Sequence, residues 1–459
     1  MSWLTRRPSS DSGFRPSDPS RTLPERNGFS TPSVTGTNEF NDLKFQIYEQ
    51  LLQELDFDVV QSLESANLRK AVEDAAATLI TAREVPLTRT DRLRLVQEVG
   101  DEILGLGPLE PLIADPSVTE IMVNGPRQVY VERNGRLNVT TTTFRDNAHV
   151  MRIIERIIAP LGRRIDEASP MVDARLLDGS RVNAVIPPLA VDGPGLTIRK
   201  FAREAFQVED LIRFGSLTAG VATFLEGCVR GKVNIVVSGG TGTGKTTLLN
   251  VLSSFIPSNE RLVTIEDPCE LQIRQPHIMR LETRSANVEG RGEITQRQLV
   301  RNALRMRPDR IIVGEVRGGE AFDMLQAMNT GHDGSLTTVH SNSPRDALAR
   351  IENMVLMADL ALPSRAIREQ VASAINVIVQ LSRMRDGSRR VTYVTEVTGM
   401  ELHDSLAVRD IYTFRYDRTE IDAPVSGQLE PTGYRPKIIE KCLAEGVEIS
   451  LDLFGPTRP

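Results

Sequence analysis

The sequence predicts an α/β chain in which a larger domain with a parallel sheet follows a smaller α+β domain and a short helical bundle. Three observations lead to this prediction. Apolar positions within 40–100 recur at helical spacing, strand-like runs within 101–201 enclose one helical stretch, and helical and strand patterns alternate beyond 223. The expected boundaries are a disordered tail at 1–40, a helical bundle at 41–100, an α+β domain at 101–201, a linker at 202–222, and the α/β domain with a carboxyl-terminal helical region at 223–459.

The composition predicts a folded chain that is preceded by a disordered amino-terminal tail. Residues 1–40 contain eight serines, five prolines and five arginines, which is typical of a disordered tail. The 459 residues are enough for two or three domains, and 40% hydrophobic with 25% charged residues is ordinary globular usage. The net charge of −6 provides no general basic field, so nucleic acid is not an expected partner.

Membrane spans and metal frameworks are not expected either. No apolar stretch approaches the roughly 18 to 20 residues that a spanning helix needs, and Arg6, Arg7 and Pro8 interrupt the start before a signal-peptide core could form. We therefore expect a cytoplasmic chain that reaches membranes only through partners. The three cysteines are far apart in the sequence and show no Cys-x-x-Cys spacing, which argues against a zinc site or a disulfide framework.

Residues 239–246 read Gly-Gly-Thr-Gly-Thr-Gly-Lys-Thr and follow the apolar run 233–238. A phosphate-binding loop has this order, because its glycines let backbone N–H groups turn toward phosphate oxygens. Lys245 would reach the β- and γ-phosphates, and Thr246 would ligate Mg²⁺. A glycine-rich turn that binds nothing is the alternative. We expect ATP and Mg²⁺ as ligands, and the expected nucleotide-binding residues are Gly239, Gly240, Thr241, Gly242, Thr243, Gly244, Lys245, Thr246 and Thr247.

Two further buried-strand runs end in carboxylates. The run 262–265 delivers Glu266, with Glu270 just beyond, and the run 310–314 presents Glu315. Ligands of open α/β sheets lie at strand ends, where two carboxylates near one Mg²⁺ can hold the ion through its waters and activate the attacking water. We assign Glu315 to the metal and its water, with Glu266 as a competing or shared general base. For Glu270 a cap or an ion pair with an arginine is the preferred interpretation.

Two of the five histidines, His332 and His340, lie within nine positions beside several glycines. An imidazole at His340 could sense the γ-phosphate or bridge to the acids, so it is included among the catalytic candidates. Metal binding is the rival interpretation, but no third ligand stands at a comparable spacing. A structural hydrogen bond is the other alternative.

Together these segments resemble the secretion ATPases, the superfamily that powers type II secretion, type IV pili and type IV secretion. The phosphate loop and the segments 264–268, 311–317 and 332–340 carry that resemblance. Further segments look like the CpaF branch, which serves Tad pili; they are 105–112, 117–125, 172–183 and 197–201. Three scattered cysteines cannot form the tetracysteine zinc insertion of type II secretion ATPases, which also favours the Tad branch and, more distantly, the type IV secretion traffic ATPases.

The resemblance implies a RecA-like P-loop ATPase domain behind a PAS-like α+β domain, assembled as a homo-hexamer with each ATP held between the two domains. Arg181 and Arg199, on strand-like segments of the α+β domain, are the family-matched candidates for phosphate contact. A guanidinium from another domain stabilises transition-state charge only when that domain closes. Arg284, Arg291 and Arg317 are further candidates, for which a surface ion pair is the preferred interpretation.

The predicted function is a hexameric ATP-hydrolysing motor for assembly of a Tad or type IV pilus, or for protein secretion, with retraction as a second direction of work. The resemblance implies an inner-membrane platform protein as partner, pilin subunits as indirect partners, and a cytoplasmic location at the inner membrane. A RecA-like nucleic acid translocase and an ATP-binding regulatory scaffold are the alternatives. The catalytic candidates are Glu315, Glu266, Lys245, His340, Arg181 and Arg199.

Overall fold

The protein is represented by a computed structural model that divides into two compact units, residues 1–108 and 109–459. The structure describes residues 37–54, 65–83, 85–133, 135–176, 178–201, 206–284, 286, 291–358, 361–401, 404–417 and 425–456. Most of the predicted tail therefore lies outside the described residues, and its last four positions, 37–40, begin the first helix. The predicted domain boundaries inside the second unit remain predictions.

The first unit contains the three helices expected from the apolar spacing. They are α1 (Thr37–Glu54), α3 (Ser65–Ala82) and α4 (Arg89–Leu104). Each helix presents one apolar stripe, and the three stripes meet in a shared core because no single stripe can be buried alone. The core residues are Phe40, Ile47, Leu51, Ala76, Ile80, Leu95 and Val99.

The second unit begins with an antiparallel sheet of six strands in the order β3-β2-β1-β6-β5-β4. Four of its strands, β1, β2, β5 and β6, match strand-like runs expected from sequence, and helix α6 (Asn147–Ile158) matches the helical stretch. Strand β3 was not expected because all four of its residues are exposed, which removes the alternating pattern that marks a half-buried strand. The strand bounds are β1 Val118–Asn124, β2 Val129–Arg133, β3 Arg136–Val139, β4 Met171–Arg175, β5 Arg181–Val185 and β6 Gly195–Arg199.

A larger sheet of nine strands follows, in the order β15-β14-β13-β12-β7-β11-β10-β8-β9. The six strands from β12 to β9 in this order are parallel, as predicted, and the α/β fold class is confirmed. The other three strands extend the sheet antiparallel, so the sheet is mixed. The bounds are β7 Ile235–Gly239, β8 Leu262–Glu266, β9 Ile278–Glu282, β10 Arg310–Val313, β11 Leu336–Val339, β12 Val377–Arg383, β13 Arg389–Met400, β14 Leu406–Tyr416 and β15 Gly427–Pro431.

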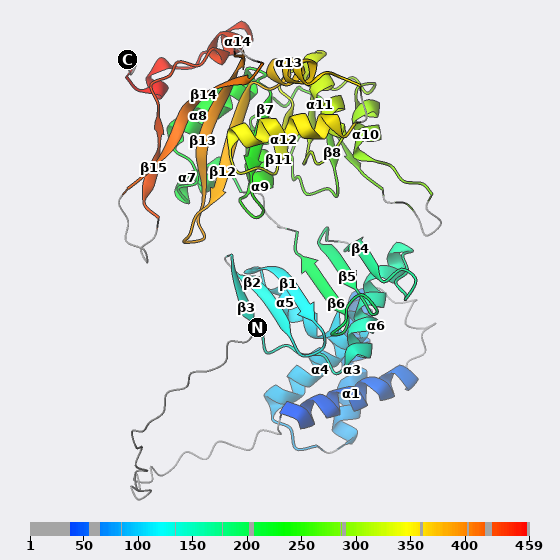
Figure 1. Cartoon of the computed structure of the whole chain (residues 1–459). Helices are drawn as coiled ribbons and strands as arrows, with labels where there is room; N and C mark the ends of the chain where they lie inside the picture. Colours follow the sequence, from blue (N-terminus) through cyan, green and yellow to red (C-terminus); the bar gives the residue numbers. More distant parts are fainter. Residues whose placement is uncertain are drawn as a thin grey trace, which may run out of the picture. The chain divides into compact units, whose positions relative to one another are not determined.

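Helices cover both faces of this nine-stranded sheet (Figure 1). Ile235 and Val237 of β7 pack into a core with α8 (Ala219–Arg230) and α9 (Lys245–Ser254), whereas Val236 packs into the opposite core with α11, α12 and α13. A strand that is buried on both faces needs apolar residues at every position, which explains the unbroken apolar runs in the sequence. The other helices are α5 Glu110–Ala114, α7 Val208–Arg213, α10 Gln296–Ala303, α11 Glu320–Asn329, α12 Pro344–Leu356, α13 Ser364–Ala374 and α14 Ile438–Ala444, with short 3₁₀ turns at Gly107–Leu109, Ala159–Leu161 and Leu451–Phe454.

Two regions differ from the sequence expectation. The predicted linker at 202–222 contains α7 and the start of α8. The expected carboxyl-terminal helical region contains α12, α13 and α14, but four strands, β12 to β15, lie between α13 and α14. Within the described parts of the chain, every helix is too short or too polar to cross a bilayer.

A largely buried ion pair, Arg310 with Glu260, lies at the start of strand β10. Arg310, the first residue of β10, has no exposed surface, and its Nη2 lies 2.9 Å from a carboxylate oxygen of Glu260. The same guanidinium donates to the carbonyl oxygens of Val229 (2.6 Å) and Gly334 (3.4 Å). The charge is therefore compensated on several sides, as burial of a guanidinium requires.

We predict that Arg310→Met lowers the apparent free energy of unfolding by about 3 kcal/mol, because it leaves a largely buried carboxylate without its partner. Urea-induced unfolding followed by circular dichroism measures the effect. Arg365→Gln is the control, since Arg365 forms an exposed i,i+4 pair with Glu369 and should change stability by less than about 0.5 kcal/mol. Equal losses in both variants would contradict the prediction.

Candidate functional site

The loop between β7 and α9 has the backbone shape of an anion cradle. Gly242 and Gly244 adopt left-handed conformations, with φ of +69° and +94°, which residues with side chains rarely adopt. A Cβ atom at Gly239 would lie 2.5 Å from Thr243 Oγ1 and 2.8 Å from the carbonyl oxygen of Leu381, so no side chain fits there. Helix α9 begins at Lys245 and directs its amino end at the same loop. The loop therefore fits a polyphosphate, as the sequence motif indicates.

Lys245 lies over this loop. Its Nζ donates a 3.0 Å hydrogen bond to the carbonyl oxygen of Gly240. Burial lowers the pKa of Lys245, and the carboxylate of Glu315 is the strongest charge that opposes this shift. A cation partly removed from water, with a backbone carbonyl as its partner, would gain more from phosphate oxygens than an exposed lysine would.

Thr246, the residue expected to ligate Mg²⁺, contacts Glu270. Its hydroxyl donates to Glu270 Oε2 at 3.2 Å, and Glu270 Oε1 lies 3.0 Å from Arg181 Nη2. Arg181 also donates to the carbonyl oxygen of Pro268 at 3.2 Å. The ion pair expected for Glu270 is thus present, but it stands beside the predicted metal ligand. Glu270 is the functional candidate that sequence reasoning set aside, and its spacing of four residues from Glu266 was the available signal.

Glu266 occupies a different environment. Its side chain is almost entirely buried, and its Oε2 accepts hydrogen bonds from the backbone N–H groups of Glu270 (2.6 Å) and Leu271 (2.7 Å). Burial raises the pKa of Glu266, and these two backbone bonds oppose the rise. A carboxylate that already holds two backbone donors shapes the segment that carries Glu270. This geometry favours Glu270 over Glu266 as the acid that faces a bound ion.

Glu315 follows β10 at the carboxyl edge of the sheet. Its Oε2 accepts two hydrogen bonds from Arg317, at 3.0 Å from Nε and 2.8 Å from Nη2. Arg317 Nη1 also lies 4.0 Å from Asp267. Arg317 therefore forms an ion pair, as preferred from the sequence. Its partner is Glu315, the acid assigned to the metal and its water.

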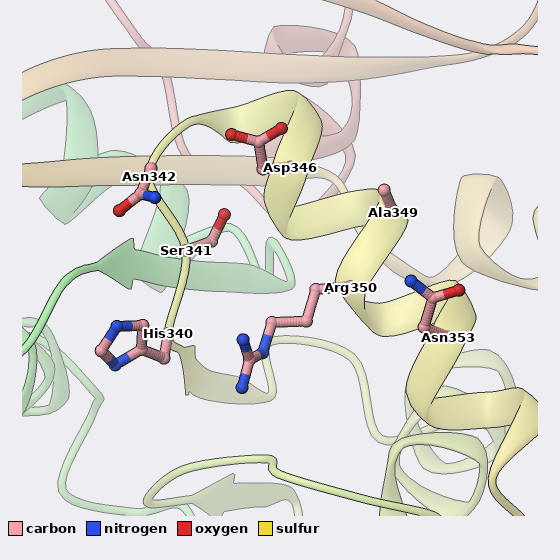
Figure 2. A pocket seen from close by; sticks show the side chains of 7 residues that line it. All are labelled: His340, Ser341, Asn342, Asp346, Ala349, Arg350 and Asn353. Atoms are coloured by element: carbon pink, nitrogen blue, oxygen red, sulfur yellow. The ribbon is translucent and has the colours of Figure 1, made fainter. Parts of the chain in front are cut away.

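The two histidines of this segment lie in different surroundings, and His340 directly follows β11. Burial lowers the pKa of His340, as do the positive charges of Lys245 and Arg350, while Glu315 opposes the shift. His340 also lines a cavity of about 310 Å³ beside α12, to which Arg350 contributes its side chain (Figure 2). His332 Nδ1 instead lies 3.3 Å from the carbonyl oxygen of Ala327, which is a structural hydrogen bond.

The two arginines carried over from the α+β domain are neighbours. Arg181 of β5 and Arg199 of β6 stand directly opposite each other in register, so their side chains share one face of the sheet. Burial lowers the pKa of Arg181, and the charge of Arg199 lowers it further. Arg284 and Arg291 lie between β9 and α10, where Arg284 Nε donates to the carbonyl oxygen of Gly292 at 2.6 Å.

One contact to the phosphate loop was not predicted from the sequence. Arg389, at the start of β13, donates from Nε to the carbonyl oxygen of Gly242 at 2.9 Å. The available signal was the density of arginines, because four stand within the eight residues 383–390. That segment follows the strand next to β7, which could not be known before the strand order was known.

Comparisons with known proteins bear on this site. A model of the family "Type II/IV secretion system protein" matches residues 102–422, and a model of the amino-terminal domain of type II secretion system protein E matches residues 40–104. A Mycobacterium tuberculosis protein named for conjugal transfer is 39% identical over 311 residues, which cover 66% of this chain and 88% of that protein. The type IV secretion system protein VirB11 of Bartonella quintana is 32% identical over 328 residues, covering 63% and 91%.

The solved structures include the VirB11 ATPase from the Brucella suis type IV secretion system in complex with sulphate. It is 30% identical and covers 63% of this chain and 95% of that chain, with a TM-score of 0.35. The first family model spans more than half of this chain. The relation to known proteins therefore rests on the sequence matches and not on this superposition.

We predict that His340 titrates below its ordinary pKa of 6.5 and that Arg350→Gln raises its titration midpoint, because a nearby positive charge is removed. The folded-state pKa is lowered, so the associated stability is present above pH 6.5 and is lost as pH falls through the folded value. NMR titration of the imidazole protons measures the midpoint. Arg345→Gln, an exposed change on the same helix, should leave it unchanged; an unchanged midpoint in Arg350→Gln would contradict the prediction.

Proposed function

Because the chain belongs to the family of type II/IV secretion system proteins, which are secretion ATPases, we propose that it is a hexameric ATP-hydrolysing motor. In this proposal it drives assembly of a Tad or type IV pilus, or secretion of protein, across the inner membrane. The single observation that carries the proposal is the chain of contacts from Thr246 through Glu270 to Arg181, because it joins the phosphate loop to an arginine of the antiparallel sheet.

The chain's own residues divide the chemistry among them. Backbone N–H groups of 239–244 and the amino end of α9 would hold the phosphates, and Lys245 would exchange the carbonyl oxygen of Gly240 for phosphate oxygens. Thr246 would hold Mg²⁺, which when bound neutralises charge on the phosphate oxygens. The glycines that exclude side chains and the hydroxyl beside a carboxylate are suited to these two ligands.

Two carboxylates remain for the attacking water. Glu315 and Glu270 both lie at the carboxyl edge of the parallel sheet, and each is held by an arginine. Release of either carboxylate from its arginine would free an acceptor for a proton of water. In the proposal Glu315 orients and deprotonates the water, and Glu270 shares the task beside the metal ligand. Glu266 keeps the segment 266–271 in shape.

Arginines of the antiparallel sheet would link hydrolysis to movement. Arg181 and Arg199 share one face of that sheet. Arg181 pairs with Glu270 beside the loop. Burial lowers the pKa of Lys245, and the positive charge of Arg199 lowers it further. A guanidinium stabilises transition-state charge only when it reaches the phosphate, so hydrolysis would require the sheet to approach the loop. The work would pass to an inner-membrane platform protein and, through it, to pilin subunits, with the motor in the cytoplasm.

We predict that Lys245→Ala abolishes ATP binding, whereas Glu315→Gln binds ATP but loses at least about 100-fold in kcat, which is the usual scale of a general base. Binding is measured by calorimetry and turnover by phosphate release. Normal hydrolysis by Glu315→Gln would show that another group activates the water. Binding without turnover in the unmodified protein would favour the regulatory scaffold.

The oligomeric part of the proposal is tested by electron microscopy of the unmodified protein with and without ATP. Six-fold particles support the motor. A second candidate, a nucleic acid translocase, predicts hydrolysis that DNA stimulates strongly and a DNA affinity that falls steeply with salt. The net charge of −6 does not favour this candidate.

We further predict that Glu270→Gln and Glu266→Gln fail in different ways. Glu270→Gln should fold normally and lose hydrolysis, because its carboxylate faces the metal ligand. Glu266→Gln can keep both backbone bonds through its amide oxygen, but it buries an NH2 donor where Oε1 has no hydrogen-bond partner among the described residues. It should therefore lower the free energy of unfolding by about 1 to 3 kcal/mol. Thermal unfolding and kcat, measured on both variants, distinguish these two effects. If Glu266→Gln is as stable as the unmodified protein but inactive, Glu266 is a catalytic residue after all.

A further inference from the structure

The hairpin that joins β12 to β13 lies beside the phosphate loop. Strand β12 runs parallel to β7, with Leu381 opposite Gly239, so it continues past the point where β7 ends and the loop begins. The close approach of Leu381 to Gly239 shows how tightly the two segments pack. Parallel strands deliver their carboxyl ends to one edge of the sheet, which is the edge where ligands of open α/β sheets lie.

Two arginines of this hairpin reach the loop. Arg389 Nε donates to the carbonyl oxygen of Gly242 at 2.9 Å, and its Cδ lies 3.7 Å from where a Cβ of Gly244 would be. Arg383 Nη1 lies 3.9 Å from where a Cβ of Gly242 would be. A loop that turns its N–H groups toward an anion turns its carbonyl groups away from it. Arg389 therefore supports the loop from the side opposite the phosphates.

These two arginines face each other across the hairpin. Arg383 and Arg389 are directly opposite each other in register, and like charges at such positions destabilise a pair of strands. The acid in the turn, Asp386, accepts hydrogen bonds from Ser388 and Val425 instead. Arg383 Nη2 donates to an uncharged group, the carbonyl oxygen of Gly135, at 2.7 Å. The hairpin thus keeps two positive charges next to a loop built for a polyanion.

Resting on the proposed function, we propose that Arg389 is a positioning residue of the nucleotide site. Its hydrogen bond to Gly242 holds the loop carbonyl outward and the neighbouring N–H groups inward, and its charge together with that of Arg383 raises the affinity for nucleoside di- and triphosphates. The effect acts on binding rather than on the chemical step, because the acids assigned to the water, Glu270 and Glu315, follow β8 and β10, which lie across β7 and β11 from this hairpin.

Arg389→Gln should weaken binding of a fluorescent ADP analogue about tenfold, since a hydrogen bond from a charged donor is lost. The KM for ATP should rise by a similar factor while kcat stays within about twofold. Arg389→Lys should recover part of the affinity, because it retains the charge. Arg383→Gln should weaken binding about threefold at low salt and hardly at all at 0.5 M salt, where the contribution of charge is screened.

The control is Arg415→Gln, which removes an exposed arginine of the same sheet that pairs with Glu430. Its affinity for the analogue should stay within about twofold of the unmodified protein. Thermal unfolding of each variant checks the fold, and Arg389→Lys remains informative if Arg389→Gln does not fold. The proposal is overturned by unchanged affinity in Arg389→Gln, by a loss of kcat at unchanged KM, or by an equal loss of affinity in Arg415→Gln.

These outcomes separate this proposal from the proposed function. If the unmodified protein binds nucleotide but neither hydrolyses it nor forms hexamers, the motor proposal is wrong and the proposed role of Arg389 still stands. If the unmodified protein binds nucleotide and Arg389→Gln binds it equally well, only the proposed role of Arg389 is wrong.

Discussion

The site depends on one backbone constraint: the segment between β7 and α9 must turn its N–H groups toward a single point. Left-handed glycines at 242 and 244 make that turn possible, and the absence of a side chain at Gly239 lets the loop pack against Thr243 and the carbonyl of Leu381. The strand before it is fixed by burial on both faces, and the helix after it is anchored in one of the two cores. The remaining groups of the site are placed relative to this loop.

Charge at the site is arranged as pairs that hold one another until an anion competes. Glu315 is held by Arg317, Glu270 by Arg181, and the ammonium of Lys245 by a backbone carbonyl. The bonds of Lys245 and of the Arg181–Glu270 pair are partly shielded from solvent, whereas the Arg317–Glu315 pair is exposed. In the proposed mechanism each is exchanged for a bond to phosphate or to an ion. Such exchange needs little rearrangement of the backbone, because the partners already stand at the same edge of the sheet.

The sequence could predict the parts of this fold that follow from local pattern. The glycine spacing of 239–246, the apolar runs before it and the helical stripes of 40–100 each reflect short-range physics, and the structure contains the corresponding loop, strands and helices. In the antiparallel extension, the pattern of 393–396 indicates a strand and lies within β13. Strands β14 and β15 could not be read in this way, because they are specified by their neighbours in the sheet. The same limit applies to the acids: the sequence favours Glu266 over Glu270 as a catalytic acid, whereas the burial of Glu266 and the contact of Glu270 with Thr246 favour Glu270. Arg389 is the clearest case, since its partner lies 147 residues away in sequence.

Arginines stand directly opposite each other at four places in the described strands: Arg133–Arg136, Arg175–Arg181, Arg181–Arg199 and Arg383–Arg389. Of these residues, Arg181 contacts Glu270 and Arg389 contacts the phosphate loop. Each pair opposes folding, since like charges across neighbouring strands repel. A polyanion at the loop would offset the repulsion at Arg181 and Arg389, the two members that contact the site. Neutralising either residue would remove the repulsion but would also remove a favourable contact, to Glu270 or to the carbonyl oxygen of Gly242. Repulsion and support therefore come from the same guanidinium at each position, and the site weakens when either one is lost.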